Sequence, residues 1–167
     1  MASKSRYELL GIDRLTAKYN RLAERFVSSE KSRVFFLKAM SIMSGSINKN
    51  FKQQGRPSAW QPLKPATIAR RRMGGKGAKI LLDTGRLRAS ATRFHEGAPN
   101  TTTKIERQFA VFGSTLEYAA THHFGDPKRN IPARPFMFFQ KQDVVDINRT
   151  LLADVKIFDE QNRIRAK

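Results

Sequence analysis

An apolar stripe between residues 30 and 51 constrains the fold more than any other feature of this sequence. Its side chains recur at steps of four and three residues, which places them on one face of a helix. Ser28 or Ser29 can cap this helix, and Glu30 lies near its positive end. Such a stripe is typical of packing against a core or another helix, and it does not indicate a cofactor site. The stripe consists of Phe36, Met40, Met43, Ile47 and Phe51.

Further helices are predicted at both ends of the chain. Residues 7–27 form an amphipathic segment, and a second apolar series follows Asp143 near the C-terminus. A short helix is expected at 116–124, with Gly125 ending it. The two apolar series are Leu15, Tyr19, Leu22 and Phe26, and Val144, Ile147, Leu151, Val155 and Phe158.

The middle of the chain predicts strands and loops. Residues 54–65 hold glycines and prolines and form a loop, which Trp60 anchors to the core. Residues 86–96 and 102–114 are predicted strands joined by a turn at 97–100, and the apolar run 136–139 is a third strand. The expected fold is therefore α+β: N-terminal helices packed with an antiparallel β-sheet and a C-terminal helix, in a single domain. We expect an N-terminal helical region at 1–53 and an α+β core at 54–167, with a basic loop at 64–80.

The charge is unevenly distributed along the chain. Of 167 residues, 32 are lysine or arginine and 14 are aspartate or glutamate, giving a net charge of +18. No acidic residue lies between Glu30 and Asp83, whereas twelve basic ones do. A solvated helix face normally mixes both signs. The excess therefore predicts a polyanionic partner, either nucleic acid or an acidic protein surface.

Six cations of the basic loop are the candidate contacts for that partner. Against duplex DNA they would act by neutralising phosphates and releasing counterions. The sequence has no helix-turn-helix or zinc-finger pattern, so base readout is not indicated and binding would be independent of sequence. The six candidates are Lys64, Arg70, Arg71, Arg72, Lys76 and Lys79.

Catalytic and cofactor sites are not predicted. The glycines after Arg72 fail the spacing of a phosphate-binding loop, and the absence of cysteine removes thiolate chemistry. His122 and His123 are adjacent on a predicted helix, about 100° apart, and cannot easily share one metal ion. We therefore expect no enzyme activity, no cofactor and no metal. No apolar run approaches the roughly 20 residues that span a bilayer, and the first ten residues lack the apolar stretch of a signal peptide. We expect the protein to be made in the cytoplasm and to have no membrane partner.

The order of several short motifs resembles one known family. The strings are "WQPLKPAT", "ILLDTGRLRAS", "VFGSTLEYAATHHFG" and "IPARPF", followed by a terminal helix led by Asp143. Together they resemble the phage virion morphogenesis family of tail-completion proteins, known from Mu-like and related contractile-tailed phages. The resemblance runs from about Phe35 to Leu152.

The resemblance implies a structural virion protein that completes the tail and joins it to the head-side neck. Such proteins commonly form rings around the DNA channel, so a homo-hexamer within the virion is expected, with other neck and tail proteins and packaged DNA as partners. A sequence-independent DNA-binding protein acting through residues 31–93 remains the alternative. Some motif residues are candidates for subunit contacts, although folding within the chain explains them equally well. They are Tyr118, His122, Phe124, Arg134 and Phe136.

Overall fold

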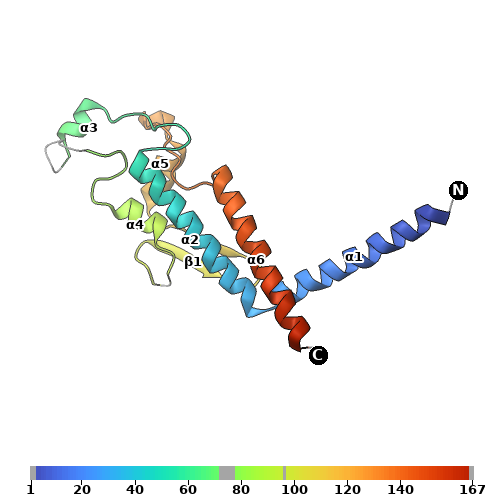
Figure 1. Ribbon diagram of the computed structural model, residues 1–167. Helices are drawn as coiled ribbons and strands as arrows, with labels where there is room; N and C mark the ends of the chain where they lie inside the picture. Colours follow the sequence, from blue (N-terminus) through green and yellow to red (C-terminus); the bar gives the residue numbers. More distant parts are fainter. Residues whose placement is uncertain (1–2, 72–77, 96, 166–167) are drawn as a thin grey trace.

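Helices form most of this single-domain α+β protein, as the sequence predicts. The structure is a computed structural model that describes residues 3–71, 78–95 and 97–165 (Figure 1). Its helices and strands are α1 (Ser3–Val27), α2 (Glu30–Gln53), α3 (Pro65–Ala69), α4 (Arg86–Thr92), β1 (Thr101–Ile105), β2 (Ala110–Ser114), α5 (Glu117–Phe124), the 3-10 helix η1 (Pro127–Arg129) and α6 (Lys141–Arg165).

Helices α2 and α6 lie side by side and run antiparallel (Figure 1). The Ser46 hydroxyl donates to Asp143 Oδ2 at 2.6 Å, and Lys38 Nζ lies 2.6 Å from Asp154 Oδ1. The start of α6 therefore packs near the end of α2, and the later part of α6 packs near the start of α2. The Asp143 carboxylate also accepts from the Gln140 backbone N–H at 2.8 Å, which places it at the beginning of α6.

Helix α1 projects away from the rest of the chain (Figure 1). Its last turn packs against α6, where the Phe26 and Phe158 rings meet edge to face with centroids 5.6 Å apart. Arg25 Nη2 donates to Asn162 Oδ1 at 3.0 Å in the same place. Farther along α1, Leu15 and Tyr19 are 52% and 60% exposed. The predicted stripe of this helix is thus buried only at its end.

The core lies where α2 meets α4, α5 and the loops between them. Trp60 anchors the loop after α2, as predicted, and its Nε1–H donates to the Pro135 carbonyl at 3.0 Å. Asn50 is fully buried and donates from Nδ2 to the Phe136 carbonyl at 2.9 Å, so a polar bond inside the core ties α2 to the segment before α6. The buried cluster is Ile47, Phe51, Trp60, Ile80, Leu81, Leu87, Ala91, Leu116, Ala119 and Phe136.

Two of the predicted strands are wrong. Residues 86–92 form helix α4, whose buried Leu87, Ser90 and Ala91 follow the helical spacing of three and four. The predicted strand at 102–114 is instead most of a hairpin, in which β1 pairs antiparallel with β2 from Thr101↔Ser114 to Ile105↔Ala110. The turn therefore lies at 106–109, and residues 97–100 precede the first strand.

The predicted strand at 136–139 is also wrong. These residues form no strand, and their side chains point to different environments, since Phe136 is 2% exposed and Phe139 is 61% exposed. The Phe136 carbonyl bonds to a side chain of α2 and so does not need a neighbouring strand. The antiparallel sheet of the described residues has two strands.

Candidate functional site

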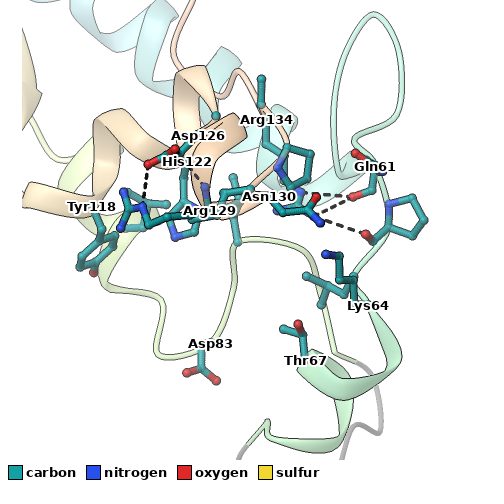
Figure 2. A pocket seen from close by; sticks show the side chains of 18 of the residues that line it. Gln61, Lys64, Thr67, Asp83, Tyr118, His122, Asp126, Arg129, Asn130 and Arg134 are labelled. Atoms are coloured by element: carbon teal, nitrogen blue, oxygen red, sulfur yellow. Dashed lines mark hydrogen bonds and ion pairs between the residues drawn. The ribbon is translucent and has the colours of Figure 1, made fainter.

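A groove of about 1070 Å³ lies between three segments that are distant in the sequence. One wall is the loop from Gln61 to Lys64 and the start of α3. The floor comes from residues 81–87, and the opposite wall comes from residues 118–134 (Figure 2). The groove is lined by members of both candidate sets, the cations of the basic loop and the motif residues expected at subunit contacts.

Arg134 joins the two walls of the groove. Its side chain is buried, and the guanidinium donates to the Gln61 carbonyl at 3.1 and 3.0 Å and to the Pro62 carbonyl at 3.3 Å (Figure 2). Its backbone N–H donates to the His122 carbonyl at 2.9 Å. A guanidinium presents several donors in a fixed plane, which suits it to bridging two neighbouring carbonyls. Arg134 thus fixes the width of the groove.

A tight turn after α5 shapes the second wall. Gly125 has a φ of 81°, and a Cβ at this position would lie 2.7 Å from the Ala133 nitrogen. The backbones of Asp126 and Ile131 exchange hydrogen bonds at 2.8 and 2.9 Å. Arg129 Nε donates to Asp126 Oδ2 at 2.6 Å, and this bond lowers the pKa of the Asp126 carboxyl (Figure 2). The glycine is therefore required for both its conformation and its small size.

The groove carries more positive than negative charge. Five cationic and two acidic side chains line it. Each acid already has a partner, because Asp126 bonds to Arg129 and Asp83 lies 3.6 Å from Arg71. The remaining cations favour an anionic ligand or an acidic protein segment. The five cations are Lys64, Arg71, Arg86, Arg129 and Arg134.

Two buried polar atoms of the groove lining have no hydrogen-bond partner among the residues that the structure describes. They are Arg71 Nη1 and His122 Nδ1. The 3.6 Å separation from Asp83 makes an ion pair but is too long for a hydrogen bond. Burial, and then the charges of Arg134, Arg71 and Arg129, lower the pKa of His122 from its ordinary value of 6.5. These effects favour the neutral form of His122, next to an Arg71 whose Nη1 has no hydrogen-bond acceptor among the described residues.

The candidate residues divide between the groove, the surface and the core. Lys64, Arg71, Tyr118, His122, Phe124 and Arg134 all line the groove. Phe124 is 76% exposed there, whereas the ring of Phe136 lies in the core, 5.5 Å from that of Phe51. Arg70 and Lys79 are exposed outside the lining. Arg72 and Lys76 lie outside the described residues.

Other groove residues were not among the candidates. Gln61 supplies a carbonyl to Arg134, and Asp126 and Arg129 form the ion pair of the second wall. The sequence signals for these residues are the prolines of "WQPLKPAT" around Gln61 and those of "DPKRNIPARP" around Asp126 and Arg129, which predict ordered loops but no particular contact.

The chain belongs to the phage virion morphogenesis family. The sequence profile of that family matches residues 12–156. A relative from Haemophilus influenzae, the Mu-like prophage FluMu G protein 2, is 32% identical over 130 residues, which cover 74% of this chain and 79% of the relative. No solved structure matches the chain.

Family membership establishes a structural role in phage virion morphogenesis. It thereby confirms the resemblance inferred from the motif order, and it associates the protein with the virion. None of the helices in the described residues is long and apolar enough to cross a membrane. Within the same residues, no group of three or more histidine, aspartate or glutamate side chains could hold a metal ion.

Proposed function

We propose that this protein is a ring-forming subunit that completes the phage tail and joins it to the head side of the neck. The observation that carries the proposal is the family match over residues 12–156, supported by a relative from a Mu-like prophage. The ring is proposed as a hexamer around the DNA channel, without enzymatic activity.

The basic groove is the proposed docking site for an acidic segment of a neighbouring virion protein. Arg71 would gain the acceptor that it lacks, and the exposed rings of Phe124 and Tyr118 would cover the apolar part of that segment. Charge complementarity of this kind selects partners and increases association rates. Lys64 is exposed at the rim of the groove and would steer the acidic segment toward it.

A phage carrying variant copies of the gene tests both parts of the proposal. Phe124→Ala should leave the purified protein folded but reduce the yield of tails joined to heads, counted by electron microscopy. Phe139→Ala is the matched control, since Phe139 is a phenylalanine 61% exposed outside the groove. Equal yields for the two variants would refute the docking site. Absence of the protein from purified virions and tails would refute the structural role itself.

A sequence-independent DNA-binding protein is the second candidate function. It is favoured by the basic residues of α2, of which Lys31, Arg33, Lys49 and Lys52 are exposed. This candidate predicts binding of free duplex DNA that weakens steeply as salt concentration increases. Negligible affinity for free DNA near physiological salt would contradict it and leave the ring proposal intact.

A further inference from the structure

The α1 arm, defined here as residues 15–25, has an apolar stripe that no other part of the described chain covers. Leu15 and Tyr19 are 52% and 60% exposed, and Leu22 is half-buried, whereas Phe26 at the base of the arm is 3% exposed. Isolated helices are marginal in water, and helices in proteins are stabilised mainly by packing of their apolar face. An arm that leaves this face open is therefore suited to packing against another molecule.

A second exposed apolar surface lies where α2 meets α6, around the Lys38–Asp154 ion pair. Val34 lies one turn before Lys38, and Ile157 lies one turn after Asp154. Because the two helices are antiparallel, Val34 and Ile157 lie on the same side of the ion pair, toward the start of α2 and the end of α6. Val34 and Ile157 are 45% and 49% exposed. We call this surface the α2–α6 seam, and it comprises Val34 and Ile157.

The arm and one end of the seam carry opposite charges. Lys18 and Arg21 flank the apolar stripe of the arm on one side, at the spacing of neighbours on a helix. Glu160 is exposed one turn after Ile157, and among the described residues it forms no ion pair. Glu160 can pair with a cation of a basic amphipathic helix, whereas the exposed Lys31, one turn before Val34, carries positive charge at the α2 side of the seam.

The arm cannot reach the seam of its own chain. Its base is held on α6 by the contact between Phe26 and Phe158, and the helix runs outward from there (Figure 1). A second copy of the chain offers the same seam without this restriction. In a head-to-tail arrangement every copy would give one arm and receive one, which generates a closed ring when the rotation fits.

We propose that the α1 arm of one copy packs on the α2–α6 seam of a neighbouring copy, with Tyr19 facing Ile157 and Lys18, at the edge of the apolar stripe, facing Glu160. This inference rests on the ring that the proposed function requires, and it names the contact that joins adjacent subunits.

The absence of cysteine from the natural chain makes a direct test simple. A Tyr19→Cys chain is mixed with an Ile157→Cys chain and oxidised, and disulfide-linked dimers are separated on a non-reducing gel. An Asn20→Cys chain replaces Tyr19→Cys as the control, since Asn20 is exposed about 100° around the helix from Tyr19. We expect the first pair to cross-link and the control pair to lose most of that product. Cross-linking between two Tyr19→Cys chains, with none to Ile157→Cys, would overturn the proposal.

Assembly measurements separate this inference from the ring proposal. The full-length Leu15→Ser/Tyr19→Ser chain should need at least about a tenfold higher concentration to reach half assembly by light scattering. The control Thr16→Ser/Asn20→Ser, with both positions exposed on α1, should assemble like the unchanged chain. If the unchanged chain forms rings that the stripe variant forms equally well, the arm is not the contact. If the unchanged chain never forms rings, the proposed ring fails as well.

Discussion

Replacing Arg134 by methionine tests how the groove is held open. Methionine keeps most of the apolar stem but cannot donate to the carbonyls of Gln61 and Pro62. Each hydrogen bond from a charged donor contributes about 1.5–3 kcal/mol, but these three share two acceptors on a solvent-exposed loop. Burial and the charge of Arg71 lower the pKa of Arg134, which means that both destabilise its charged form. Removing the charge recovers part of the free energy that these two effects cost.

The net expectation is a loss of about 1–3 kcal/mol in the free energy of unfolding, below the sum of the separate bonds because they are not additive. For a domain of this size, 2 kcal/mol corresponds to a decrease of about 4–8 °C in Tm. Arg134→Lys keeps the charge but not the planar fork, so it should recover less than half of the loss.

Urea unfolding measures the global effect, and hydrogen exchange of a peptide covering residues 58–68 measures the local one. We expect faster exchange in that peptide because the loop loses its attachment to the opposite wall. A change in unfolding free energy within about 0.5 kcal/mol, the range of ordinary surface substitutions, would refute the reasoning. It would mean that the cost of burying the guanidinium cancels its hydrogen bonds.

Two further predictions concern the same wall. The stability of the fold should decrease as pH falls below 6.5. Burial lowers the pKa of His122 and His123, so the unfolded chain takes up protons at a higher pH than the folded chain does. Urea midpoints that stay constant from pH 7.5 to 5 would contradict this. Gly125→Ala should cost about 1–3 kcal/mol, since its Cβ would lie 2.7 Å from the Ala133 nitrogen at a positive φ, and a thermal melt matching the unchanged chain would show that the turn can rearrange.

Helical periodicity carried most of what the sequence could predict about the fold. The stripes of α1, α2 and α6 are long enough for the 3.6-residue period to be distinguished from alternation, and Gly125 ended α5 where expected. Helix α4 has only seven residues, and within so short a segment its small apolar side chains also fit a strand. Its helical spacing becomes decisive only when the buried residues are known.

The hairpin was missed because its turn has no glycine or proline. Residues 106–109 are charged, polar and aromatic, and the turn is closed by the Glu106 N–H donating to the Phe109 carbonyl at 2.9 Å. The apolar side chains of 136–139 predict a strand, yet Asn50, far away in the sequence, satisfies the carbonyl of Phe136. The turn is local but has none of the residues that signal one, and the Asn50–Phe136 bond is not local, so sequence pattern supplied neither feature.

The groove was predictable only in part, for the same reason. The charge distribution predicts Lys64 and Arg71 as contacts of a polyanionic partner, and the motifs make Tyr118 and His122 candidates for subunit contacts. Nothing in the sequence indicates that these four residues share one groove. The contact that unites them is Arg134 with the carbonyl of Gln61, two residues 73 positions apart.

Under the proposed function, the unpartnered atoms of the groove link docking to pH. Arg71 and His122 each bury an atom without a hydrogen-bond partner, which costs stability in the isolated chain. An incoming carboxylate would accept from Arg71 and favour protonation of His122, so docking would recover that cost. Under the proposed function, affinity for an acidic segment should therefore increase as pH falls, while the stability of the isolated chain decreases. These opposite responses can be measured on the same protein, and a pH-independent affinity would exclude His122 from the docking contact.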